Sequence, residues 1–301
     1  ISFVINEFWL EWTNLLSQSD TGTVFQTPEY LSCWVESFIK KEEVLVIKVL
    51  DNNELIGIAA LRKQQDKVTF LGTDPVGKNN DLVTDFGDIV AKKGREKEVW
   101  EEVIGAIREI GSASWRIREM VLDYIRENSP SFKILKELGF SYSQILDGTI
   151  PDVAPALDLP SSFDDHINSL ERKNRHEWRR KLRRLENAEY KIKISEEASD
   201  VGEFIRLHRA STVKKDLFMS LEMENFFTKA ITMLSAKGLI DLVFMEIEGK
   251  NVSSTLSFLW DQEYWLYNSG FDRNYENLAV GFLLKGLTIK RAIELGYNKY
   301  N

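Results

Sequence analysis

The residues from Asn268 to Gly286 carry the strongest chemical signal in the sequence. An aromatic strand is predicted to end near Asn268, a polar loop follows, and a helix opens around Leu278 with no side chain to cap it. The unpaired N–H groups of a first helical turn can bind phosphate, and glycine allows a phosphate to approach closely. We therefore expect a pyrophosphate to be held by the main-chain N–H groups of Leu278, Ala279, Val280, Gly281 and Phe282. The alternative is that Gly281 only lets the helix pack closely on a strand.

Three side chains near this segment could transfer protons. Tyr267 and Asp272 flank the end of the aromatic strand, where a tyrosine could act as a proton donor and an aspartate as a base. His208 lies within a helical apolar pattern, so a buried structural histidine is the alternative to a general base. These residue types suit acyl transfer, in which an amine or hydroxyl loses a proton and a thiolate gains one.

A basic run extends from Arg172 to Arg184 and contains eight Lys and Arg residues with a single acid, Glu177. Like charges four residues apart on a helix repel each other by a few tenths of a kcal/mol. Because Arg175 and Arg179 form such a pair, we expect them to serve an anionic ligand, which would be cofactor phosphates, RNA or acidic residues of the first half of the chain. A solvated helix face is the alternative.

Composition excludes several other classes of protein. The net charge of −8 is unlike that of a general nucleic-acid binder. The Walker A, Rossmann glycine, nucleophile-elbow and HExxH motifs are absent from the sequence. One cysteine, Cys33, and three histidines make poor material for a zinc site, so we expect no metal and a reduced, cytoplasmic protein. No apolar run approaches the ~18 residues that a membrane span needs.

The chain is predicted to form two domains, residues 1–150 and 151–301. Three prolines between Pro151 and Pro160 mark the boundary. Residues 44–110 and 240–295 share one order of strand, turn, strand, turn, strand, loop and helix, which predicts a degenerate internal repeat. Short hairpin turns favour mixed α/β sheets over a doubly wound parallel sheet. One helix is expected to start at Ser162 and to run as far as Leu185.

These pieces together resemble the acyltransferases of the GNAT superfamily, in the branch of CelD-like cellulose-biosynthesis acetyltransferases that is related to Fem peptidyltransferases. The matching segments are Phe25–Pro28, Leu159–Phe163, Arg175–Leu185, Leu207–Ala210, Gly270–Asp272 and Gly281–Leu284. The branch usually has Ser-Pro-Gly where this chain has Ala279-Val280-Gly281, so only the glycine carries over. The branch also has a segment after its last strand, so we expect the second domain to continue past Asn301.

The resemblance implies tandem GNAT-like acyl-CoA N-acyltransferase domains, of which the second binds the acyl-CoA. The expected co-substrate is acetyl-CoA or another acyl-CoA. The expected acceptor is an amine or hydroxyl of a sugar or of a cell-surface or polysaccharide precursor. Two alternatives stay open: a Fem-like peptidyltransferase that uses aminoacyl-tRNA, and a non-catalytic binding protein with the same fold.

Overall fold

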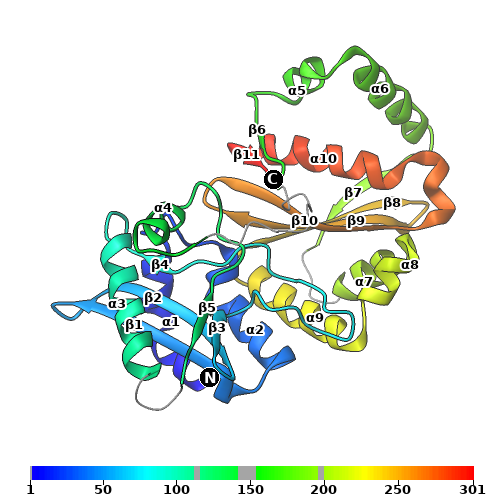
Figure 1. Ribbon diagram of the computed structural model, residues 1–301. Helices are drawn as coiled ribbons and strands as arrows, with labels where there is room; N and C mark the ends of the chain where they lie inside the picture. Colours follow the sequence, from blue (N-terminus) through cyan, green and yellow to red (C-terminus); the bar gives the residue numbers. More distant parts are fainter. Residues whose placement is uncertain (1, 112–115, 142–153, 196–199) are drawn as a thin grey trace. The chain divides into compact units, whose positions relative to one another are not determined.

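The computed structural model describes residues 2–111, 116–141, 154–195 and 200–301. It divides into two compact units, Ile1–Pro151 and Asp152–Asn301. Each unit is built around one mixed sheet with helices packed on it (Figure 1). The expected mixed α/β class is therefore confirmed.

The sheet of the first unit has the order β1-β2-β3-β5, and β4 also pairs with β2. Its strands are β1 (Val44–Asp51), β2 (Glu54–Gln64), β3 (Lys67–Phe70), β4 (Val90–Ala91) and β5 (Glu119–Val121). The first three strands form an antiparallel meander, and β5 returns parallel to β3.

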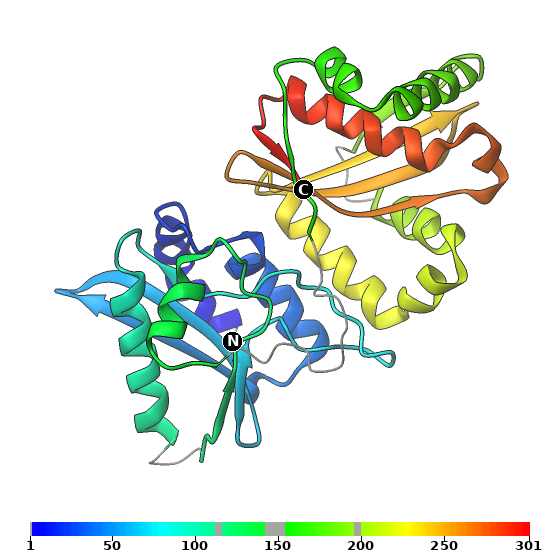
Figure 2. The same cartoon turned by 45° about the horizontal axis from the view of Figure 1, so that its top comes forward.

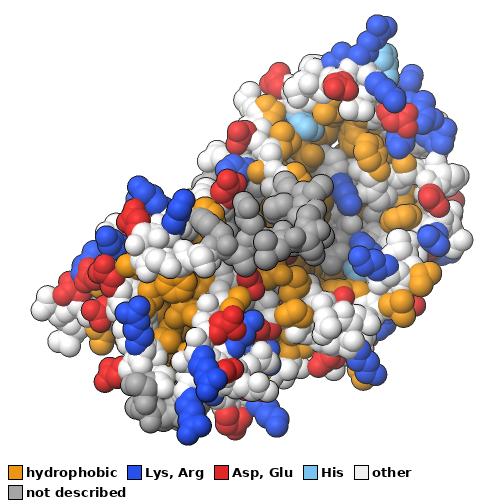
Figure 3. Space-filling view, in the orientation of Figure 1, with side chains coloured by type: hydrophobic (Ala, Val, Ile, Leu, Met, Phe, Trp, Pro, Cys, Tyr) orange, Lys and Arg blue, Asp and Glu red, His pale blue; other side chains and the backbone are white. Residues whose placement is uncertain are grey.

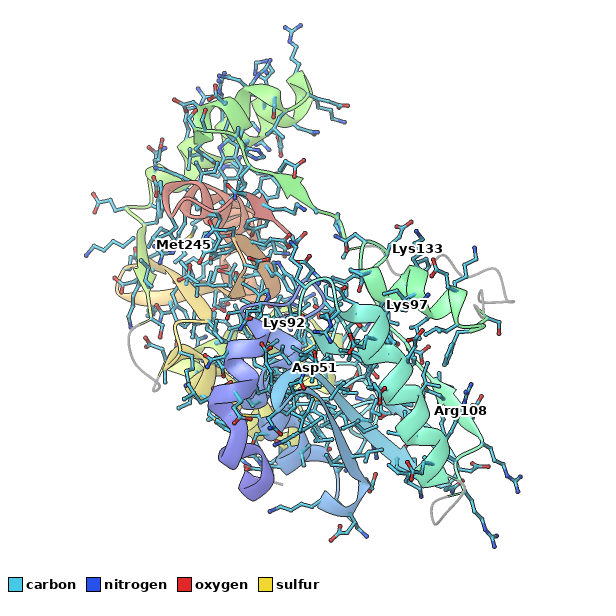
Figure 4. All side chains as sticks on the ribbon, turned by 90° about the vertical axis from the view of Figure 1, so that its left-hand side faces the viewer. Asp51, Lys92, Lys97, Arg108, Lys133 and Met245 are labelled. Carbon is cyan, nitrogen blue, oxygen red and sulfur yellow. The ribbon has the colours of Figure 1, made fainter. Side chains whose placement is uncertain are left out.

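The helices of the first unit are α1 (Ser2–Leu16), α2 (Pro28–Phe38), α3 (Glu96–Ile110) and α4 (Pro130–Glu137), with short turns η1 (Val24–Gln26) and η2 (Lys41–Glu43). Helix α2 begins at Pro28 after an N-cap at Thr27, whose hydroxyl accepts a hydrogen bond from the Tyr30 N–H. α3 packs on β1 and β2 and contacts α4. Lys97 of α3 and Lys133 of α4, labelled in Figure 4, both place their amines about 4 Å from the Glu137 carboxylate.

The sheet of the second unit has the order β6-β11-β10-β9-β8-β7. Its strands are β6 (Leu157–Asp158), β7 (Lys191–Ile194), β8 (Ile240–Ile247), β9 (Lys250–Trp260), β10 (Glu263–Phe271) and β11 (Lys299–Tyr300). Strands β7 to β10 are antiparallel to their neighbours, and β11 lies parallel to β10.

Helices cover both faces of this second sheet. They are α5 (Phe163–Ser169), α6 (Arg172–Glu186), α7 (Asp200–Ser211), α8 (Val213–Phe218), α9 (Leu221–Ser235) and α10 (Val280–Glu294), with η4 (Arg273–Leu278) before α10. Figures 1 and 2 show α5, α6 and α10 on one face and α7, α8 and α9 on the other. Met245 of β8, labelled in Figure 4, is fully buried in the core beneath α10.

The central hairpins of the two units have the same strand lengths and the same turn length. Strands β1 and β2 have the lengths of β8 and β9, each boundary differs by 196 residues, and each pair carries a bulge just before its turn. Yet none of the 21 aligned residues is identical. The shared plan therefore depends on where apolar and turn residues stand, as a degenerate repeat predicts.

The single helix expected from Ser162 to Leu185 is wrong. Ser162 does cap a helix, but Leu170 is extended (φ −64°, ψ 147°) and separates α5 from α6. Arg175 of α6 donates to the carbonyl oxygens of Asn168 and Leu170 and so satisfies groups that the end of α5 leaves open. The side chain that supplies these hydrogen bonds lies beyond the break, which a helical pattern does not reveal.

A buried carboxylate fixes α10 on the sheet. Asp241 of β8 accepts hydrogen bonds from Arg291 of α10 (2.6 and 3.2 Å) and from the Tyr264 hydroxyl of β10 (2.8 Å). Burial raises the pKa of Tyr264 well above its usual range, and the Asp241 charge adds to this effect. Helix α10 and strand β10 therefore hold one relative position, which the site described next requires.

Candidate functional site

Strand β10 has a bulge at Tyr267. Leu266 pairs with Ser257 and Asn268 with Leu256, so Tyr267 is the extra residue between two regular pairs. A bulge interrupts the hydrogen-bond ladder and frees main-chain groups at that point. The half-buried Tyr267 ring packs on Phe258 (centroids 4.8 Å apart) and on Phe227 of α9. The expected strand end near Asn268 is therefore an irregularity within a strand that continues to Phe271.

The start of α10 has no side-chain cap, as the sequence predicted. Ala279 precedes the helix in a left-handed conformation (φ 55°, ψ 34°), and the first turn contains no acid. The N–H groups of Val280, Gly281 and Phe282 thus lack the side-chain oxygen that ordinarily satisfies one of them. Such a turn attracts anions, because its N–H groups and the helix dipole act in the same direction.

The corresponding helix of the first unit begins with acids instead. In α3, Glu96 accepts a hydrogen bond from the Gly94 N–H (2.9 Å). Glu98 forms a two-point ion pair with Arg95, and these hydrogen bonds lower the pKa of Glu98. Among the described residues, neither carboxylate accepts a hydrogen bond from an N–H group within the first turn of α3, but their negative charge would repel a phosphate there. The two helix starts therefore differ in charge, because the first turn of α3 contains acids and that of α10 contains none.

Gly281 lies over strand β10. A Cβ atom at this position would lie 3.0 Å from Cδ1 of Phe271, so it would point at the strand and not along the free N–H groups. A side chain at this position would therefore meet β10 first, as the alternative of close packing between helix and strand predicts. Close packing of helix on strand explains the glycine, and phosphate binding at the first turn stays a prediction.

Helix α6 runs beside the start of α10, and its basic side chains gather at the upper right of Figure 3. Arg184 donates to the Asn277 carbonyl oxygen (3.0 Å), and the Lys181 ammonium lies 4.4 Å from the centre of the Phe282 ring. Arg175 and Arg179 lie nearer the α5 end of the helix, where both donate to Asn168. Arg175 is nine residues from Arg184, or about 13 Å along the helix axis.

His208 of α7 is buried, with 1% of its surface exposed. Burial lowers its pKa to about 4, the nearby Lys215 charge adds to this effect, and the Asn268 side chain offsets part of it. Its Nδ1 atom has no hydrogen-bond partner among the described residues. Gly270 lets α7 pack closely on β10, because a Cβ at this position would lie 2.4 Å from the main-chain nitrogen of His208. The structure therefore places the neutral imidazole beside the bulge.

Lys215 is a site residue that the sequence analysis missed. It lies on α8, a six-residue helix that the sequence patterns did not indicate, and its ammonium donates to Asn268 Oδ1 (3.4 Å) and to the Ser269 carbonyl oxygen. Burial lowers its pKa to about 8, and the Lys285 charge adds to this shift. A lysine with long-range contacts only can be found in the folded structure but not in a periodic pattern.

Asp272 caps the turn η4. Its carboxylate accepts a hydrogen bond from the Asn274 N–H (2.9 Å), so it shapes the loop before α10. Lys215 and His208 both interact with Asn268, the residue after the bulged Tyr267, while Asp272 lies five residues past Tyr267, after the strand. The role of Asp272 as a base stays a prediction, and the structure gives it a capping role.

The comparisons with known proteins agree with this geometry. Residues 172–301, which make up most of the second unit, match the family described as acetyltransferase (GNAT) domain. No curated protein sequence matches the chain.

Three solved structures are similar over almost the whole chain. FemX is 15% identical, with a TM-score of 0.69 over 97% of this chain and 86% of that one. L-PGS from Bacillus licheniformis is 10% identical, with a TM-score of 0.58 over 97% and 74%. A protein of unknown function from Bacteroides thetaiotaomicron is 12% identical, with a TM-score of 0.52 over 97% and 87%. At these identities the likeness shows the fold alone.

Across residues 2–111, 116–141, 154–195 and 200–301, no three His, Cys, Asp or Glu side chains group as metal ligands would. In the same part of the chain, no helix is both long and apolar enough to cross a bilayer.

Proposed function

We propose that the protein transfers an acyl group from acyl-CoA to an amine or hydroxyl. The observation that carries this proposal is that one unit contains both an uncapped helix start and a bulged strand. The helix start would bind the phosphates of the donor, and the bulge would lie at its acyl carbonyl group. Both features belong to a domain that matches the GNAT acetyltransferase family. The match supports a transferase and leaves the donor to be tested.

In the proposed site, the N–H groups of Val280, Gly281 and Phe282 bind the pyrophosphate of the donor. Lys181 and Arg184 supply cationic charge beside this turn. Main-chain N–H groups freed at the bulge would stabilise the negative charge that develops on the thioester oxygen. The acceptor attacks the carbonyl carbon directly, the C–S bond breaks, and CoA leaves as a thiol after it gains a proton.

Tyr267 and His208 are the proposed proton-transfer groups. The Tyr267 side chain lies at the bulged residue and could protonate the leaving thiolate. His208 is held neutral by burial, so at pH 7 it is able to accept a proton rather than already carrying one. No covalent enzyme intermediate is needed for this route.

We further propose an acceptor from sugar or cell-surface precursor chemistry, as expected from the resemblance to CelD-like acetyltransferases. A second candidate donor is aminoacyl-tRNA, favoured by the likeness to FemX and by the exposed basic face of α6. Both donors contain an adenosine that bears phosphate and an activated acyl group, which is a thioester in acyl-CoA and an ester in aminoacyl-tRNA. The same helix start and bulge would therefore serve either donor.

Calorimetric titration separates these candidates. Acetyl-CoA and an aminoacylated tRNA are titrated separately into the protein, and each is repeated with the Tyr267→Phe variant. We expect the protein and the Tyr267→Phe variant to bind acetyl-CoA with the same affinity. We expect the variant to lose the release of CoA in mixtures that contain acceptors. Binding of the tRNA alone would replace the donor, and binding of neither would contradict enzymatic acyl transfer by this site.

A further inference from the structure

Within the part of the chain that the structure describes, the ammonium group of Lys215 has no anionic partner. Its two hydrogen-bond acceptors, Asn268 Oδ1 and the Ser269 carbonyl, are neutral, and no ion pair forms at Lys215 within the described residues. A lysine ammonium has three donors, so one remains for another group. Because charged side chains in partly buried positions are ordinarily paired, this environment lacks an anion.

The surrounding groups increase the positive potential. Lys285 of α10 is close enough to act on Lys215 electrostatically, and the neighbouring His208 is neutral. Arg209 pairs with Glu224 (2.8 Å), and Asp272 is engaged with the Asn274 N–H. No described carboxylate forms an ion pair with Lys215, and the charge that acts on its pKa is that of Lys285.

The position of the ammonium limits which molecule can supply the anion. Asn268 and Ser269 are one and two residues past the bulge, which is about 3–7 Å along a strand. Lys215 reaches β10 from α8, which lies on the sheet face opposite to α10. The donor phosphates are proposed to lie at the start of α10. An acceptor that attacks the acyl carbon must approach from the side that the donor leaves open.

We propose that Lys215 binds a carboxylate of the acceptor, which is therefore an amine or alcohol with an acid group a few bonds from its nucleophilic atom. This inference rests on the proposed function, because it assumes that the acyl carbon lies at the bulge. Amino acids and amino- or hydroxy-sugar acids have this spacing. The buried Nδ1 of His208, which lacks a partner, provides a further polar atom beside the same position.

The first test does not need catalysis. Lysines are reductively methylated with ¹³C-formaldehyde, and the Lys215 signal is assigned by its loss in Lys215→Gln. Acetate, titrated at constant ionic strength, is expected to shift this signal saturably and to raise the pKa of Lys215 by about half a unit or more. Lys285→Gln is expected to raise it as well, since a repelling charge is removed. Absence of a saturable acetate shift would overturn the proposal, and saturation by inorganic phosphate alone would overturn the carboxylate assignment.

The second test uses acceptors and a matched control. Lys214 is the exposed neighbour of Lys215 on α8, so Lys214→Gln removes the same charge outside the site. With acetyl-CoA as donor, Lys215→Gln is expected to raise KM for amino-acid acceptors about tenfold, with little change for the corresponding amides. Lys214→Gln is expected to change neither, and Lys215→Arg is expected to restore part of the difference.

The two hypotheses can fail separately. If acetyl-CoA does not bind in calorimetry, the proposed donor is wrong, while the acetate titration of Lys215 still decides the anion site. If Lys215→Gln weakens succinyl-CoA but not acetyl-CoA, the anion belongs to the acyl group and the acceptor assignment is overturned.

Discussion

Gly270 of β10 and His208 of α7 meet main chain to main chain. A Cβ atom on Gly270 would lie 2.4 Å from the His208 nitrogen and 2.4 Å from the Leu207 carbonyl carbon. Neither atom belongs to a side chain that could rotate away, so helix and strand would have to separate. This contact sets the distance between the buried imidazole and the bulged strand.

Gly270→Ala is therefore expected to destabilise the second unit by about 1–3 kcal/mol, the usual cost of overpacking. The matched control is Gly202→Ala in α7, the helix that contains His208, where a Cβ would meet nothing within 4 Å. That change is expected to stabilise by about 0.5–1 kcal/mol, because alanine favours a helix over glycine. Urea unfolding of both variants measures the difference, and equal midpoints would contradict the close approach.

A second prediction concerns the uncapped start of α10. Ala279→Asp places a carboxylate beside the free N–H groups, which favours the helix but competes with phosphate. We expect acetyl-CoA affinity to fall at least tenfold, or about 1.4 kcal/mol, with the thermal midpoint unchanged or higher. Ala279→Asn has nearly the same shape without the charge and also tolerates the left-handed conformation. If both variants bind acetyl-CoA equally well, the phosphate does not lie at this turn.

A third prediction separates the two ends of α6. Lys181→Gln combined with Arg184→Gln removes charge beside the start of α10 and is expected to weaken donor binding about tenfold. Arg175→Gln combined with Arg179→Gln removes the same charge near α5 and is expected to have a smaller effect on affinity. Calorimetry at two salt concentrations measures both. A larger loss from the second pair would favour the expectation drawn from the sequence.

A fourth prediction concerns pH. The pKa of His208 is about 4 in the folded protein and about 6.5 when unfolded, so the unfolded state binds more protons between these values. Stability of the second unit is therefore expected to fall as pH drops from 6.5 towards 4, by at most about 1.4 kcal/mol per pH unit from this residue. His208→Gln should flatten the slope in denaturant unfolding. Substitution of the exposed His176 by Gln provides the control for the loss of an imidazole outside the core.

Local patterns predicted much of the fold because local interactions determine those elements. Helix α3 follows from the helical spacing of buried residues such as Val99, Val103 and Ile107, and Thr27 caps α2 as its Thr-Pro pair indicates. The hairpins follow from apolar runs that flank two-residue turns, and residues such as Asn52 and Asn53 have the positive φ that these turns need.

The site was less predictable because distant residues assemble it. The break at Leu170 is stabilised from α6, and the direction of Gly281 is defined only by Phe271 on a separate strand. Lys215 becomes notable only when β10 supplies its acceptors. Contacts of this kind have no fixed spacing in the sequence, so periodicity indicated the segment around Tyr267 but not the lysine beside it.

The third strand of the first unit is interrupted, and this determines where the chain can be lengthened. β3 ends at Phe70, and Val90 of β4 then pairs with Ile58 as Gly270 pairs with Ser254 in the other hairpin. The intervening residues leave the sheet and return, and residues 78–80 are exposed. A tag or reporter peptide inserted there would lengthen the connection between β3 and β4 and leave strand pairing intact. The same insertion at Tyr267 would break a continuous strand, so the two hairpins offer an engineer one permissive position and one forbidden position.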